Sequence, residues 1–241
     1  MRVHDRVVVI GGGSGMGLEV AKKLLAAGAE VVIAGRSEER LHAARTTLGV
    51  DRVETVTADI GERSQVAALF ARAGRLSHVV VTAADLPYGP VLDLTENDVM
   101  RAVRSKLLGP LFVAQESAAR LGPGGSITFT SGIAARRPMR GGSAAAALNS
   151  GLEGLVRALA VELAPIRVNA VSPGWTDTPI WDGMPGMTAE RKREVLTSMA
   201  ARLPTGRIGQ PEDIADAVVF LMKSQFSTGA VLDVDGGHRL V

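Results

Sequence analysis

The segment IGGGSGMG, at residues 10–17, has the residue types and spacing to bind phosphate. An apolar run at 7–10 precedes it, a helical pattern at 17–27 follows, and a second apolar run at 31–34 completes a βαβ unit. Backbone N–H groups of such a loop, with the positive end of the helix, face a dinucleotide pyrophosphate. A tight structural turn also uses glycines, but this context favours a dinucleotide site. Its expected members are Gly11, Gly13, Ser14, Gly15, Met16 and Gly17.

The segment AGR at 34–36 indicates which dinucleotide is bound. Gly35 offers no carboxylate for the ribose hydroxyls of NAD, whereas Arg36 offers a guanidinium suited to a 2′-phosphate. A solvated arginine just before a helix capped by Ser37 is the alternative. The sequence therefore favours NADP(H) over NAD(H). Asp59, in TADI, is expected to accept a hydrogen bond from the adenine amino group, with an ordinary loop or N-cap aspartate as its alternative.

Alternating strand and helix patterns position these residues. β-rich runs occur at 7–10, 31–34, 53–56, 78–82, 126–130, 167–172 and 230–234. Helical patterns occur at 17–27, 38–47, 63–73, 96–121, 143–163, 188–201 and 211–222. Several runs are continuously apolar, as in parallel strands buried on both faces. The alternation predicts one α/β domain over residues 1–241: a Rossmann-type, doubly wound, parallel sheet of about seven strands with helices on both faces.

The long irregular segment 173–209 is expected to form a lid or a binding loop around the helix at 188–201. Trp175, Trp181, Met184 and Met187 favour an apolar lid, although plain packing explains these side chains equally well.

The composition excludes several other classes of protein. The formal net charge is +2 and no basic stripe with interleaved aromatic residues occurs, so a nucleic-acid partner is not expected. The absence of cysteine excludes disulfides, thiol catalysis and thiolate metal ligands, and no metal site is predicted. No signal sequence precedes the first strand, and no apolar run reaches the length of about 18 residues of a membrane span. We expect a cytoplasmic protein that acts on a small molecule, without membrane contact.

Matches to a known family extend over essentially the whole chain. The glycine loop is similar to the TGxxxGxG loop of the short-chain dehydrogenase/reductase family, with Ile10 at the usual threonine. Further matches are TADI around Asp59, FTSG around Ser131, RVNAVSPGWTDT at 167–178, RIGQPEDIADAVVFLM at 207–222 and STGAVLDVDGG at 227–237. The resemblance implies a nicotinamide cofactor. It also implies further cofactor contacts at Ala83, Asn149, Pro173, Gly174 and Thr178.

The family's catalytic set is asparagine, serine, tyrosine and lysine, and the resemblance places only one of the four in this chain. In the family, tyrosine is the general acid, and a lysine one helical turn later lowers its pKa and binds the nicotinamide ribose. Ser131 matches the serine that orients the substrate oxygen. Ala145 and Asn149 stand at the tyrosine and lysine positions, and Lys106 stands where the asparagine is usual. The segment TAAD at 82–85 replaces the usual NNAG.

Lys106 is the candidate to carry the proton in place of the tyrosine, together with Ser131, because burial lowers a lysine pKa toward a useful range. Alternatively, Lys106 bonds backbone carbonyls or a phosphate and fills the vacated space. Tyr88, the single tyrosine of the chain, is expected at the rim, where it touches substrate or packs on its own loop. The loop arginines Arg136, Arg137 and Arg140 either attract an anionic substrate or are ordinary exposed residues.

The sequence thus predicts an NADP(H)-dependent oxidoreductase of carbonyl or alcohol groups with an altered proton relay. The alternative is a catalytically silent NADP(H)-binding protein that acts as a sensor or as a partner subunit. No residue argues specifically for a third option, non-redox chemistry such as an elimination. The expected substrate is apolar or anionic. The resemblance implies assembly through the helix at 143–163 and the helix before it. The small-residue face of the helix at 143–163 predicts a homo-oligomer, either a dimer or a tetramer.

Overall fold

The computed structural model describes residues 5–49, 52–183 and 186–241, and within them seven strands form one parallel sheet. The strand order is β3-β2-β1-β4-β5-β6-β7. The strands are β1 (Arg6–Ile10), β2 (Glu30–Gly35), β3 (Val53–Thr57), β4 (Leu76–Val81), β5 (Leu121–Thr130), β6 (Arg167–Pro173) and β7 (Val231–Val234). The predicted doubly wound α/β architecture is confirmed.

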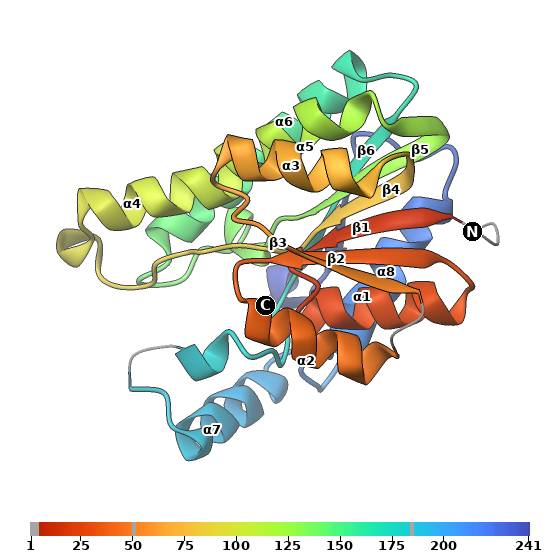
Figure 1. Cartoon of the computed structure of the whole chain (residues 1–241). Helices are drawn as coiled ribbons and strands as arrows, with labels where there is room; N and C mark the ends of the chain where they lie inside the picture. The colour runs from red at the N-terminus through yellow and green to blue at the C-terminus, as the bar shows by residue number, and fades with distance from the viewer. Residues whose placement is uncertain (1–4, 50–51, 184–185) are drawn as a thin grey trace.

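Helices cover both faces of this sheet (Figure 1). They are α1 (Gly15–Ala26), α2 (Glu38–Leu48), α3 (Arg63–Ala73), α4 (Glu96–Val103), α5 (Gly109–Ala118), α6 (Ser143–Glu162), α7 (Ala189–Ala200) and α8 (Pro211–Lys223). Figure 1 shows α3, α5 and α6 on one face and α1, α2 and α8 on the other. No helix in the described ranges is long and apolar enough to cross a membrane.

The central strand β1 explains why both faces need a cover. Successive side chains of a strand point to opposite faces. Val8 and Ile10 belong to the hydrophobic cluster that includes α3, α5 and α6. Val7 and Val9 belong to the cluster that includes α1, α2 and α8. All four side chains are almost completely buried, so the strand reads as a continuous apolar run in the sequence.

The single helix predicted over 96–121 is wrong in two places. A π-helical turn at Arg104–Leu108 separates α4 from α5, and the Gly109 N–H donates to the carbonyl five residues earlier. Pro110 has no N–H with which to continue the regular pattern, so a widened turn before it costs little. Leu121 begins β5 because it pairs with β4 across the sheet, a contact that helical periodicity cannot reveal.

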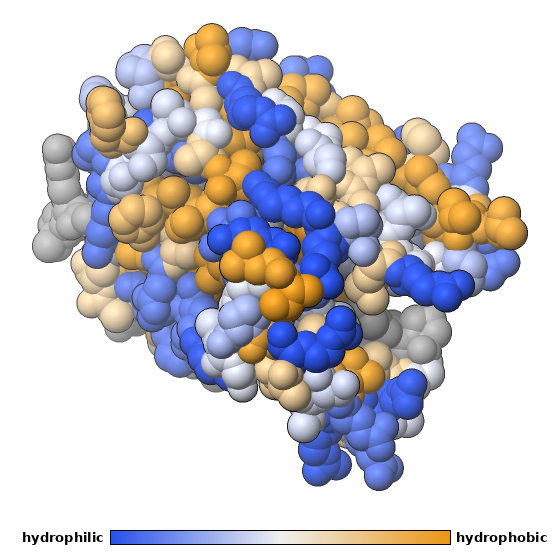
Figure 2. Space-filling model, turned by 180° about the vertical axis from the view of Figure 1, so that it is seen from behind, coloured by the Kyte–Doolittle hydropathy of each residue, from blue (hydrophilic) through white to orange (hydrophobic). Residues whose placement is uncertain are grey.

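The segment after β6 leaves the body of the fold. It contains a 3-10 turn at Trp181–Gly183 and then α7, whose start is capped by the Thr188 hydroxyl, 3.1 Å from the Arg191 N–H that it accepts. None of the residues of α7 is buried. Figure 2 shows hydrophilic side chains over the projection that α7 forms at the lower right. The helix predicted at 188–201 is therefore present.

Candidate active site

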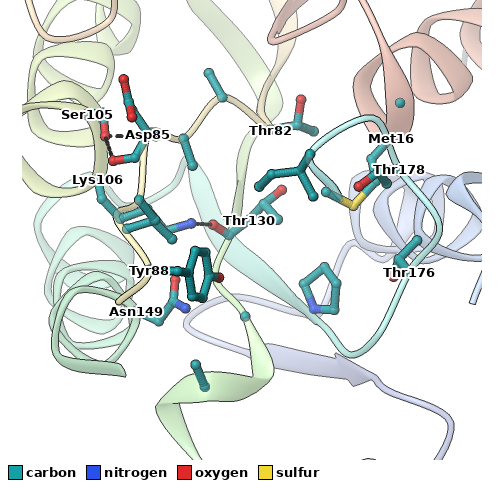
Figure 3. A pocket seen from close by; sticks show the side chains of 18 of the residues that line it. Met16, Thr82, Asp85, Tyr88, Ser105, Lys106, Thr130, Asn149, Thr176 and Thr178 are labelled. Atoms are coloured by element: carbon teal, nitrogen blue, oxygen red, sulfur yellow. Dashed lines mark hydrogen bonds between the residues drawn. The ribbon is translucent and has the colours of Figure 1, made fainter. Parts of the chain in front are cut away.

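One cavity of about 1880 Å³ opens at the carboxyl ends of the strands, where the strand order reverses beside β1 (Figure 3). Ligands bind at this point in doubly wound folds. All of the predicted cofactor residues line it: Gly11, Gly13, Ser14, Gly15, Met16, Gly17, Arg36, Asp59, Ala83, Asn149, Pro173, Gly174 and Thr178. Ser131 and Lys106 line it as well. The structure therefore brings together residues that lie far apart in the sequence.

The glycine loop allows α1 to approach the sheet closely. Gly11 has a φ of +93°, and a Cβ there would lie 2.5 Å from the Thr82 hydroxyl oxygen. A Cβ on Gly17 would overlap the Gly11 carbonyl oxygen and lie 2.6 Å from the same hydroxyl. The N-cap residue Ser14 makes no side-chain cap hydrogen bond, which leaves the first N–H groups of α1 to a ligand. This cradle suits a pyrophosphate.

Two arginines, Arg36 and Arg40, line the end of the cavity near β2. Arg36 pairs with Asp85, with 2.9 Å between guanidinium and carboxylate, and Arg101 approaches the same carboxylate at 3.4 Å. Arg40, in the first turn of α2, also lines the cavity and was missed by the sequence interpretation. The Asp59 carboxylate accepts the Gly61 N–H at 2.8 Å, as the loop alternative predicts.

Lys106 extends from the π-helical turn into the floor of the cavity (Figure 3). Its Nζ donates to the carbonyl oxygen of Thr130 at 2.6 Å and to that of Ser131 at 3.4 Å, at the end of β5. Only 3% of the residue is exposed, and burial lowers the pKa of its ammonium group to about 8. These are the carbonyl contacts that the space-filling alternative predicts. The lowered pKa also brings the group into the range of a general acid.

Ser131 is held by a carboxylate that the sequence interpretation missed. Its hydroxyl donates to Glu153 at 2.9 Å, and Glu153 accepts from Arg136 at 2.7 Å. Arg136 also approaches Asp233 at 3.3 Å. The alternative in which Arg136 attracts an anionic substrate is not supported, because two carboxylates hold Arg136 and it does not line the cavity.

Ala145, Asn149 and Glu153 form a stripe on α6, since residues four apart lie on one helix face. Ala145 is completely buried. Asn149 is 3% exposed, and its Oδ1 has no hydrogen-bond partner among the described residues. A buried amide oxygen without a partner is costly unless a ligand supplies one. A sugar hydroxyl in the cavity is such a donor.

Aromatic side chains of the segment after β6 form one wall. Trp175 and Trp181 stack with ring centroids 4.8 Å apart, and the Trp181 indole N–H donates to the Thr176 carbonyl at 2.8 Å. Met187 lines the cavity with them, whereas Met184 lies outside the described residues. Tyr88 lines the opposite rim and is 39% exposed; its partial burial raises the pKa of the phenol. The sequence interpretation missed Met199, Arg202 and His238, which also line the cavity.

The sheet order, the glycine cradle and the switch-point cavity define a dinucleotide-binding protein of the Rossmann type. The family model described as enoyl-(acyl carrier protein) reductase matches residues 11–239. A short-chain dehydrogenase/reductase of Gibberella fujikuroi, fsr5, is 35% identical over 98% of this chain and 95% of its own length. The chain therefore belongs to the short-chain dehydrogenase/reductase family.

Further similarities connect the chain to oxidoreductases. The cis-4-hydroxycyclohexanecarboxylate dehydrogenase of Sinomonas cyclohexanicum is 34% identical, over 98% of both proteins. The solved structure of the MalC reductase/Diels-Alderase from Malbranchea aurantiaca has a TM-score of 0.91 and 33% identity, covering 99% of this chain and 98% of that one. A small-chain dehydrogenase in complex with NADPH has a TM-score of 0.83 and 33% identity, covering 99% of this chain and 100% of that one.

Proposed function

We propose that this protein is an NADP(H)-dependent oxidoreductase that interconverts carbonyl and alcohol groups by hydride transfer and uses an altered proton relay. The observation that carries the proposal is that the glycine cradle of α1 opens into the same cavity as Ser131 and Lys106. The similarity to a dehydrogenase that was solved with NADPH supports the choice of cofactor.

The residues that line the cavity match the parts of this cofactor. The loop around Gly11 and the start of α1 would hold the pyrophosphate, and Arg36 with Arg40 would hold the 2′-phosphate. Asn149 would accept a hydrogen bond from the nicotinamide ribose through its unpartnered Oδ1. When bound, the cofactor supplies or accepts a hydride.

The residues of this chain would handle the accompanying proton. Lys106 is proposed to donate a proton to the substrate oxygen during reduction, in place of the family tyrosine, whose position the resemblance assigns to Ala145. Ser131 is proposed to orient that oxygen. Because its hydroxyl hydrogen lies toward Glu153, its oxygen is free to accept from an alcohol O–H. To donate to a carbonyl, the hydroxyl must first turn away from Glu153.

A catalytically silent nucleotide-binding protein is the second candidate. The engagement of Lys106 by two backbone carbonyls and of Ser131 by Glu153 favours it, since both groups already have partners. Such a protein would bind NADP(H) in the same cradle and act as a sensor or as a partner subunit.

Turnover distinguishes the two functions. We expect the purified protein to bind NADPH and to oxidise it with at least one member of a panel of ketones and aldehydes. Ser131→Ala is expected to lower that rate by about 10- to 100-fold, the cost of one strong hydrogen bond to the reacting oxygen. Ser150→Ala, on the exposed side of α6, is the matched control and should leave the rate unchanged. Tight NADPH binding without turnover of any compound would instead support the silent protein.

The choice between the two cofactors is expected to depend on Arg36. Arg36→Gln should weaken NADPH binding by about 10- to 100-fold and leave NADH binding within about twofold, because only NADPH carries the 2′-phosphate. Arg45→Gln is the control: it removes an exposed guanidinium from α2, the helix that follows Arg36, outside the cavity. This variant should change neither affinity. Fluorescence titration measures both affinities. An equal loss for NADH and NADPH would show that Arg36 does not select the cofactor.

A further inference from the structure

The charges that line the cavity are unevenly distributed. Among the described residues its lining contains two carboxylates, Asp59 and Asp85, and both follow strands at the cofactor end. Asp85 is already paired with Arg36 and Arg101. Beyond β5, the described part of the lining contains the imidazole of His238 and three cations, and no carboxylate; the cations are Arg137, Arg140 and Arg202.

The sheet topology separates these cations from the cofactor phosphates. Arg36 follows β2, whereas Arg137 follows β5 and His238 follows β7. β2 and β5 are three strand positions apart in the sheet, which corresponds to about 14 Å at the usual strand spacing. The nicotinamide end of a dinucleotide carries no phosphate beyond the pyrophosphate. The cofactor therefore does not account for a positive end at β5 to β7.

Ion pairs with carboxylates distinguish Arg136 from Arg137 and Arg202. Arg136 is neutralised by Glu153 and Asp233. Across the described ranges of the chain, no carboxylate lies within ion-pair distance of Arg137, Arg140 or Arg202. Burial, then the Arg137 guanidinium and last Arg202 lower the pKa of His238, against an opposing contribution from the Asp235 carboxylate. Two segments that are distant in the sequence thus place positive charge beside the imidazole of a third segment.

The surface between these cations is apolar. The stacked Trp175 and Trp181 stand beside His238, whose ring lies 6.3 Å from that of Trp175. Ile133, Met187 and Met199 add further apolar surface to the same cavity. A volume of about 1880 Å³ exceeds the range of roughly 300–1,000 Å³ for a site that holds one small ligand, so a substrate has room beside the dinucleotide.

We propose that Arg137 and Arg202, beside His238, form an anion subsite, and that the substrate is an oxo or hydroxy compound with an apolar body and a terminal carboxylate or phosphate. The inference rests on the proposed function, since it names the substrate class of that site. The apolar body lies against the tryptophan wall, and the anion pairs with guanidinium groups that lack a protein carboxylate. Arg140, more exposed at the rim, draws the anion toward the mouth of the cavity.

Calorimetric binding to the complex with NADP⁺ tests the subsite without requiring turnover. The probes are 4-oxo-4-phenylbutanoate and 6-oxoheptanoate, each with its methyl ester, and acetoacetyl-coenzyme A as the phosphate-bearing arm. Each acid is compared with its methyl ester, and the coenzyme A thioester is compared with ethyl acetoacetate. In at least one pair, the anionic probe is expected to bind at least about 10-fold more tightly than the neutral one. The pair that shows this difference identifies whether the subsite binds a carboxylate or a phosphate.

The double variant Arg137→Gln/Arg202→Gln is expected to weaken that anionic probe by about 10- to 100-fold and to leave the neutral probes unchanged. The matched double variant Arg45→Gln/Arg193→Gln removes the same charge from two exposed arginines outside the cavity and should have no effect. Neutral probes that bind as tightly as all the anions, or anion binding that survives the double variant, would overturn the subsite. Anion binding that needs both arginines, in a protein without turnover, would keep the subsite and refute the oxidoreductase.

Discussion

Gly17→Ala is expected to disrupt the fold around the cofactor site and to abolish NADPH binding. The new Cβ would overlap the Gly11 carbonyl oxygen and lie 2.6 Å from the Thr82 hydroxyl oxygen. The first of these is a backbone atom in a loop with a positive φ, so it cannot turn aside as a flexible side chain would. Relief requires α1 to move away from the sheet. Overpacking of this kind costs about 3 kcal/mol, which corresponds to a fall in Tm of about 6–12 °C for a chain of this size.

Gly13→Ala is the matched control for this prediction. A Cβ at Gly13 would have its nearest neighbour at 3.5 Å, the Arg40 Cβ, which is ordinary contact. Its Tm is therefore expected to stay within about 2 °C of the parent protein. Differential scanning calorimetry and an NADPH titration measure both effects. A folded Gly17→Ala protein with normal Tm and normal NADPH affinity would show that the close approach of α1 is not needed.

Local patterns were sufficient to predict the frame of this molecule. Val7 and Val9 are buried on one face of β1 and Val8 and Ile10 on the other, so the run is apolar throughout and indicates a central parallel strand. The glycine loop is largely local, because two of the three atoms nearest to a Cβ at Gly17 belong to Gly11, six residues earlier in the chain. The same holds for the Ser37 cap of α2, whose hydroxyl accepts the Arg40 N–H at 3.2 Å.

Contacts between distant segments could not be read from the sequence. Arg136 and Arg137 are adjacent, yet Glu153 holds one while the other lines the cavity. Only the packing of α6 against the 3-10 turn at Ile133–Ala135, which directly precedes the two arginines, decides this difference. Arg202 and His238 reach the cavity from the segment after α7 and the turn after β7, and neither has a local motif. The break between α4 and α5 is similar, since Leu121 belongs to a strand only through its pairing with β4.

Lys106→Met is expected to lower carbonyl turnover by about 10²–10⁴-fold, the usual contribution of a positioned general acid. NADPH affinity should change by less than about threefold, because Lys106 bonds the carbonyls of Thr130 and Ser131 rather than the glycine cradle. Tyr88→Phe is the matched control, since it removes the phenol, which is another proton donor of the cavity wall. If Tyr88→Phe removes turnover and Lys106→Met does not, the proton comes from the phenol.

The pH dependence provides a second measurement of the same group. Burial lowers the pKa of Lys106 from 10.5 to about 8, so the native protein binds fewer protons than the unfolded chain between these values. Stability therefore rises with pH across this window, by about 3 kcal/mol at 1.36 kcal/mol per unit, and the gain is lost as pH falls through 8. Denaturant unfolding at pH 7 and pH 10 should show this rise relative to Lys106→Met, which lacks the group. Reduction should slow above pH 8 in the parent protein, because the proton donor is then neutral. Equal pH slopes in both proteins, for unfolding and for turnover, would refute a buried, proton-donating Lys106.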